Sequence, residues 1–248
     1  MSLVDRRSVL ATAGLVAVLA GLMATFPARL ALSWFAPGMI GAWGVEGTVW
    51  RGRAAEISVS GESLGALSWD AYPVRLLLLQ PAWDLELRRH DGYARGRLDF
   101  SLLGNRQTLT DLDASLSLAT MPRRIVPDGV AGNLRVALQR LEISRGWPTV
   151  IAGRASVADL DLPGVILTLG PFEFSFPEQS GSPAGDIRSL GGPLAVDGRI
   201  ELPERHQWHF GADLAPGENP PKELVDGLAF VGEDLGNGRR RLVLSSKP

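Results

Sequence analysis

Polar and apolar residues alternate along most of the chain after residue 44. The clearest run is Asp111 to Leu118, which reads D-L-D-A-S-L-S-L, and Trp83 to Arg88 follows the same pattern. The alternation returns at 134–139, 172–176, 194–202 and 207–211. Because successive side chains of a β-strand point to opposite faces, a period of two predicts strands with one buried and one solvated side.

Short segments rich in glycine, proline and asparagine separate these runs. They are His90-Asp91-Gly92, Gly104-Asn105, Pro127-Asp128-Gly129, Pro163-Gly164 and Gly236-Asn237-Gly238. Tight connections between strands that each have one wet face predict antiparallel hairpins rather than a parallel sheet. We expect about a dozen strands, and because no linker divides them, they should form one β domain over residues 44–248.

The apolar sides of so many strands must be hidden, and two arrangements can do this. Two sheets can stack into a closed sandwich, or one elongated antiparallel sheet can curve strongly around its apolar side. Long runs at 95–103 and 109–118 and glycines within strands, such as Gly96 and Gly153, favour the highly curved single sheet. Its apolar face is predicted to carry Leu98, Phe100, Leu112, Leu116, Leu118, Leu134, Val136 and Leu138.

Few segments of the chain carry helix signals. Pro220-Pro221 followed by Lys222-Glu223 predicts one short helix near the C-terminus, because proline fits the first helical turn and an acidic residue suits it. Leu76 to Leu79 is ambiguous between a strand and a helical turn. The fold class is therefore mainly β.

The chain opens with an apolar run from Ser8 to Phe26, SVLATAGLVAVLAGLMATF. As a helix these residues would span about 28 Å, enough to cross a hydrocarbon core. Arg6 and Arg7 precede the run, and by the positive-inside rule they keep the N-terminus in the cytoplasm. We expect a cytoplasmic segment at 1–7, a transmembrane anchor at 8–26 and a juxtamembrane segment at 27–43. The anchor residues include Ser8, Leu15, Val18, Leu22 and Phe26.

Two other interpretations of this run stay open. A cleaved secretory signal is one, although the run is longer than a usual signal core and no small-x-small site follows it. A twin-arginine export signal at Asp5-Arg6-Arg7-Ser8 is the other. All three place the chain from Trp34 onward outside the cytoplasm.

Composition narrows the classes of function. The formal net charge is −2, which argues against nucleic-acid binding, since phosphate recognition needs a basic surface. Cysteine is absent, which excludes disulfides, thiol nucleophiles, iron–sulfur clusters and cysteine-containing zinc sites.

No arrangement of residues indicates catalysis. His206 and His209 would share a face on a helix but point to opposite sides of the predicted strand, and Glu204 with His206 makes a poor metal site. The remaining candidates are Asp111 with Asp113, Asp159 with Asp161, the loop Ser180-Gly181-Ser182, and Gly191-Gly192-Pro193. The aspartates lie on solvated strand faces, the serines lack a constrained nucleophile turn, and the glycines lack a phosphate-binding lysine. We therefore expect no enzymatic activity, no cofactor and no metal.

One motif stands at the start of the β region. Gly47-Thr48-Val49-Trp50-Arg51-Gly52-Arg53-Ala54 is followed by Leu67-Ser68-Trp69, then by Pro73 and the leucines at 76–79. In this order and spacing the segments resemble the type II secretion system protein N family. Gly132-Asn133-Leu134, Gly198-Arg199-Ile200 and the C-terminal glycine turn extend the resemblance, whereas Ser156 and Val157 replace a tryptophan that the family often has.

The resemblance implies a bitopic inner-membrane protein with its C-terminal domain in the periplasm. It implies a non-enzymatic component of the type II secretion pathway that assists export across the outer membrane, with other inner-membrane and periplasmic components as partners. A periplasmic sheet protein that holds a lipid or another amphiphile in an apolar groove is the alternative. The motif residues Gly47, Thr48, Trp50, Gly52, Ala54 and Trp69 are expected to pack the first hairpins or to contact a partner.

Overall fold

The computed structural model describes residues 14, 21–22, 24–35, 40–76, 78–101, 104–123, 126–164, 167–179, 181–203 and 207–246. Within them, fifteen strands form one sheet in the order β1-β3-β4-β5-β6-β7-β8-β9-β10-β11-β12-β13-β15-β14, and β2 pairs with β3. Neighbouring strands are antiparallel throughout the described sheet. The prediction of a mainly antiparallel β architecture is confirmed.

The strands have the following bounds: β1 (Ile40–Trp43), β2 (Glu46–Gly47), β3 (Arg51–Val59), β4 (Glu62–Ala71), β5 (Ala82–Arg89), β6 (Gly92–Ser101), β7 (Arg106–Ser117), β8 (Ala131–Ser144), β9 (Trp147–Asp161), β10 (Phe172–Phe176), β11 (Ala184–Ser189), β12 (Leu194–Glu201), β13 (His209–Pro216), β14 (Glu233–Gly236) and β15 (Arg239–Ser245). The helices are α2 (Ala28–Phe35), α3 (Pro73–Leu76) and α4 (Lys222–Leu228), with a 3-10 turn, η1 (Leu118–Thr120).

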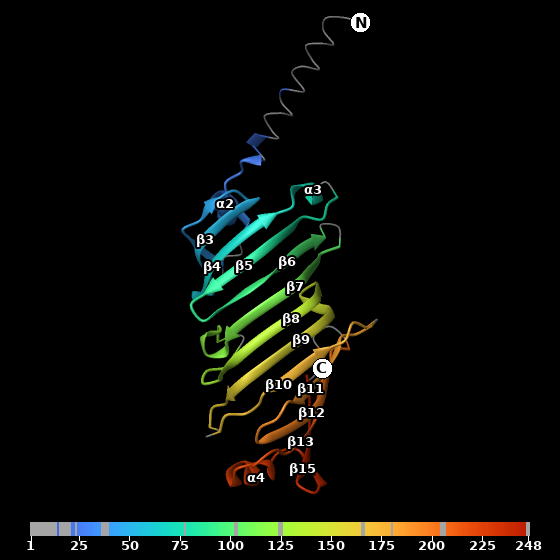
Figure 1. Cartoon of the computed structure of the whole chain (residues 1–248). Coiled ribbons are helices and arrows are strands. Elements are labelled where there is room, and N and C mark those ends of the chain that lie inside the picture. Colours follow the sequence, from blue (N-terminus) through green and yellow to red (C-terminus); the bar gives the residue numbers. More distant parts are fainter. Residues whose placement is uncertain are drawn as a thin grey trace, which may run out of the picture.

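The sheet is an elongated single layer (Figure 1). Strands follow one another along its length in nearly sequential order, with α2 at one end and α4 at the other. The strands from β11 to β15 are seen more edge-on than β3 to β9, so the sheet twists along its length. The described strands therefore do not form the closed two-sheet sandwich that the sequence left open.

The segments predicted as turns from their glycine and asparagine residues do connect strands in the structure. His90 to Gly92 joins β5 to β6, and Asn105 and Asn237 adopt the left-handed backbone conformation in their turns, with φ of 44° and 53°. The short C-terminal helix is present as α4. Of the ambiguous leucines after Pro73, Leu76 ends α3, and Leu78 and Leu79 lie in a turn, in which Leu79 has φ of 55°.

The predicted transmembrane anchor lies almost entirely outside the described residues, including Ser8, Leu15 and Val18. Leu22 is exposed, and the ring of Phe26 packs against Trp34 with centroids 5.8 Å apart. Among the described residues, no helix is long and apolar enough to span a bilayer.

A bulge in β7 corrects the simple alternation read from the sequence. Leu109 and Leu112 are three positions apart, which would place them on opposite faces of a regular strand. Asp111 has φ of 53°, and the β6–β7 register shifts between Arg95 and Arg97. A Cβ on Gly96 would lie 3.4 Å from Leu109 Cδ1 and 3.3 Å from Leu112 Cα. The extra residue therefore keeps both leucines on one face.

The best-buried cluster lies over the C-terminal half of the sheet. Its buried members are Leu169, Phe172, Ile187, Val196 and Ala212. The connection between β9 and β10 folds back here, where Leu160 and Leu169 exchange backbone hydrogen bonds of 2.9 and 2.7 Å. This connection covers part of the apolar face.

Candidate functional site

The motif Gly47 to Gly52 forms the tip of the β2–β3 hairpin. The Thr48 amide donates to the Arg51 carbonyl at 2.9 Å, and Thr48 Oγ1 accepts from the amides of Trp50 and Arg51 at 3.3 and 3.2 Å. Gly47 has φ of 89°, and a Cβ there would lie 2.4 Å from the Arg51 carbonyl oxygen. Only glycine fits this position, because an L side chain would be strained and would collide with backbone.

Two tryptophans fasten this hairpin to the next strands. The indole Nε1 of Trp69 donates to the Thr48 carbonyl at 3.0 Å, and that of Trp83 donates to the Val49 carbonyl at 3.2 Å. Trp69 lies over Gly52, where an added Cβ would be 2.4 Å from Trp69 Cζ2. Trp50 is half-buried and Ala54 is 1% exposed. These contacts favour packing over partner contact as the role of the motif. The motif pattern did not single out Trp83 as a member of this group.

Replacing Gly52 with alanine should destabilise the protein by about 1–3 kcal/mol, because overpacking forces neighbours out of place. The obstacles are the Trp69 ring and the Glu46 carbonyl oxygen, which would lie 2.6 Å from the new Cβ. Urea unfolding followed by tryptophan fluorescence measures the change. Gly211→Ala is the matched control, since that strand glycine has open space around its Cβ. Equal stability of the two variants would contradict the packing role.

The register brings the predicted apolar face together across β6 to β8. It pairs Leu112 with Leu138, Ala114 with Val136, Leu116 with Leu134, and Leu98 with both Trp83 and Leu109. Phe100 packs edge-on against Trp83, with centroids 5.7 Å apart, and Leu118 is 8% exposed in η1. Apart from Leu118, these predicted residues are only half-buried. Figure 1 shows no other described strand or α-helix lying over the face at β5 to β8, while the turn η1 reaches the end of β5, where Arg89 Nη2 donates to the Thr120 carbonyl at 2.8 Å.

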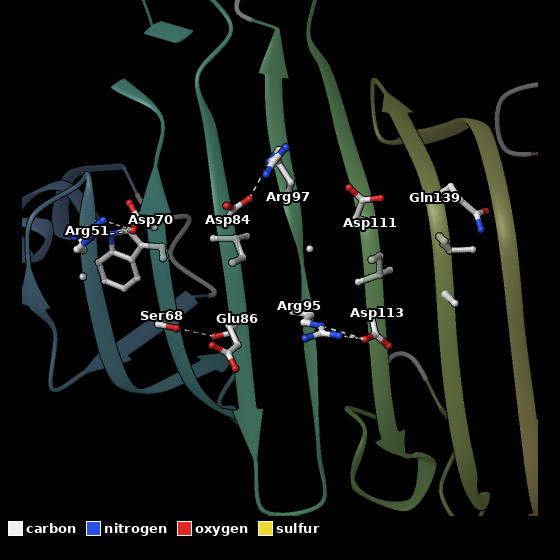
Figure 2. A pocket seen from close by; sticks show the side chains of 17 residues that line it. Arg51, Ser68, Asp70, Asp84, Glu86, Arg95, Arg97, Asp111, Asp113 and Gln139 are labelled. Carbon is white, nitrogen blue, oxygen red and sulfur yellow. Dashed lines mark hydrogen bonds and ion pairs between the residues drawn. The ribbon is translucent and has the colours of Figure 1, made fainter. Parts of the chain in front are cut away.

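The opposite face of the sheet carries cross-strand ion pairs. Arg51 Nη2 lies 2.6 Å from Asp70 Oδ2, and Arg95 Nη2 lies 2.7 Å from Asp113 Oδ2. Arg97 Nε lies 2.9 Å from Asp84 Oδ1. Figure 2 shows these side chains rising from adjacent strands around a shallow hollow of about 880 Å³. Each exposed pair contributes little to stability, but together they leave a hydrophilic, largely neutralised surface.

Asp84 in this hollow accepts hydrogen bonds from Tyr72 and Arg97. Its partial burial acts to raise its pKa, but hydrogen bonds from Arg97 and Tyr72 outweigh burial and hold the pKa below the usual value. The carboxylate is therefore ionised at neutral pH and serves as an ion-pair partner. It is not poised to exchange protons near pH 7.

The candidates for chemistry do not gather into a site. His90 is exposed in the β5–β6 turn, and His209 is exposed in β13, while Glu204, His206 and Ser180 lie outside the described residues. Asp113 is paired with Arg95, and Asp159 accepts a hydrogen bond from Asn133 at 3.2 Å. In the part of the chain that the structure describes, no group of three or more His, Cys, Asp or Glu side chains could hold a metal ion.

Comparison with known proteins shows the family to which this chain belongs. The family model described as type II secretion system (T2SS), protein N, matches residues 39–243, from the first strand into the last. The chain belongs to this family. The type II secretion protein N of Aeromonas hydrophila is 28% identical over 232 residues, covering 91% of this chain and 92% of the relative. Those of Vibrio cholerae and Pectobacterium carotovorum are 26% and 25% identical, and each alignment covers at least 86% of both chains.

Membership of the protein N family makes this chain a component of secretion machinery rather than an enzyme. It implies a location in the cell envelope and contact with other components of the type II system. The resemblance inferred from the glycine–tryptophan motif is confirmed. No solved structure matches the chain.

Proposed function

We propose that this protein N is an inner-membrane-anchored periplasmic component that assists the type II pathway in exporting proteins across the outer membrane. The observation that carries the proposal is the family match over 39–243, which includes nearly the whole sheet. The apolar run at 8–26, preceded by Arg6 and Arg7, supports a single-pass anchor with a cytoplasmic N-terminus. In this proposal neither face of the sheet catalyses a reaction. The sheet supplies surfaces on which other components assemble.

A deletion strain tests the role in secretion. We expect a type II substrate to accumulate in the periplasm of the deletion strain, and its export to return when the full chain is supplied in trans. The measurement is the substrate's activity in medium and periplasm, with a cytoplasmic enzyme as the lysis control. Normal export from the deletion strain would refute the proposal.

Reporter fusions after Pro248 test the topology. Alkaline phosphatase should be active and β-galactosidase inactive, because the C-terminus would lie in the periplasm. The N-terminus of the purified protein should begin at Met1 or Ser2, whereas an N-terminus near residue 30 would indicate a cleaved signal instead of an anchor.

A second candidate is that the sheet holds a lipid or another amphiphile. It is favoured by the half-buried apolar face at β5 to β8, over which no described strand or α-helix lies. A contiguous exposed apolar patch is unusual on a solitary soluble domain. Organic extraction and mass spectrometry of the purified full chain would detect a bound amphiphile.

A further inference from the structure

The face of the sheet that carries the ion pairs is called the charged face here. Two of its arginines have no carboxylate partner, unlike the other arginines of the strands. On the strands that the structure describes, every arginine except Arg135 in β8 and Arg154 in β9 lies within salt-bridge distance of a carboxylate. Both side chains are exposed. The two exceptions stand on adjacent strands.

The register explains why they are unpaired. Arg135 lies between Ser115 of β7 and Ser156 of β9. Arg154 lies between Ala137 of β8 and Ser175 of β10. Beside Arg51, Arg95 and Arg97, in contrast, the neighbouring strand carries an acid, as Asp113 does beside Arg95. The small uncharged neighbours leave both guanidinium groups open to solvent.

The arginines line one hollow of about 460 Å³, together with Tyr93, Ser115 and Ser156. They are diagonal neighbours across β8 and β9, so their Cα atoms are roughly 7–8 Å apart. Two acids also line the hollow. Asp113 is already paired with Arg95, so Glu173 is the acid that competes with an incoming anion. Two arginines against one free carboxylate leave the hollow positive.

We propose that Arg135 and Arg154 form a docking site for the carboxylates of an acidic segment on another protein of the secretion machinery. A guanidinium presents a planar fork of donors that matches a carboxylate, and the neighbouring serine hydroxyls can donate further hydrogen bonds. The hollow lies on the charged face, so the acyl chains of an anionic lipid bound there would contact ion pairs and serines. We therefore infer that the partner is a protein. The proposal rests on the proposed function, which supplies the partner.

The test places a photo-crosslinking amino acid at Ala137, which is exposed and directly opposite Arg154, in the full-length chain in secreting cells. The same amino acid at Ser68, between Arg53 and Glu86 on the paired part of this face, is the control position. We expect a crosslink from position 137 to a peptide rich in Asp or Glu. It should be lost in R135Q/R154Q, weakened but still present in R135K/R154K, which keeps the charge without the fork, and strengthened in E173Q.

The outcomes separate this inference from the proposed function. A crosslink to phospholipid, no crosslink, or a crosslink unchanged in R135Q/R154Q would overturn the docking site while secretion in the deletion strain still tests the function. R135Q/R154Q should unfold at the same urea concentration as the wild type, because neither arginine has a partner to lose. Export should fall in this variant, and wild-type export would also overturn the site.

Discussion

Replacing Phe172 with alanine should lower the free energy of unfolding by about 3–5 kcal/mol, the range for truncating a buried aromatic side chain. Phe172 is 5% exposed and packs in the cluster with Leu169, Ile187 and Val196. The loop that returns over the sheet at Leu169 cannot easily collapse into the space left, because its backbone is fixed to Leu160 by hydrogen bonds. Urea unfolding of the full chain, followed by tryptophan fluorescence, measures the loss.

Phe230→Ala is the matched control for this prediction. Its ring is 89% exposed after α4, so the same truncation removes no buried contact and should change stability by less than about 0.5 kcal/mol. Similar losses in the two variants would mean that the C-terminal cluster does not stabilise the sheet.

The order of strands and turns follows from local pattern and could be predicted. A period of two in hydrophobicity, interrupted by glycine and asparagine turns, leaves few alternatives to an antiparallel meander. The residues placed on one apolar face, such as Leu112 and Leu138, become cross-strand neighbours because each hairpin fixes its own register. Part of the glycine–tryptophan motif also acts locally, since Gly47 meets Arg51 and Gly52 in its own hairpin, whereas Gly52 meets the Trp69 ring of β4.

Three features depend on more than one strand, and the pattern along a single strand did not predict them. The bulge at Asp111 interrupts the alternation and becomes meaningful only when β6 is laid beside it. The contact of Trp83 with the Val49 carbonyl joins residues 34 positions apart. Arg135 and Arg154 have no carboxylate partner because of the residues that lie beside them on the neighbouring strands. In the sequence, the spacing of two polar residues between Leu109 and Leu112 is the signal that could have indicated the bulge.

Replacing Leu116 with arginine should abolish export while the chain stays folded. Leu116 is half-buried and pairs with Leu134 on the apolar face of a single-layer sheet. Because Leu116 is only half-buried near the end of β7, the long arginine side chain can reach solvent, and the free energy of unfolding should fall by less than about 2 kcal/mol. The charge would nevertheless repel whatever apolar surface the face receives, whether a protein component or an amphiphile.

Ser117→Arg is the matched control, because the next residue of β7 points to the opposite, charged face. It should leave both export and the urea midpoint near those of the wild type. Unfolding of Leu116→Arg would show that the face is closed in the native protein, since an unpaired charge in a sealed core costs several times more than on an open surface. Normal export with Leu116→Arg would show that the open face is not used in secretion. Loss of export in a folded Leu116→Arg chain, with Ser117→Arg unaffected, would establish the apolar face as a functional surface distinct from the charged one.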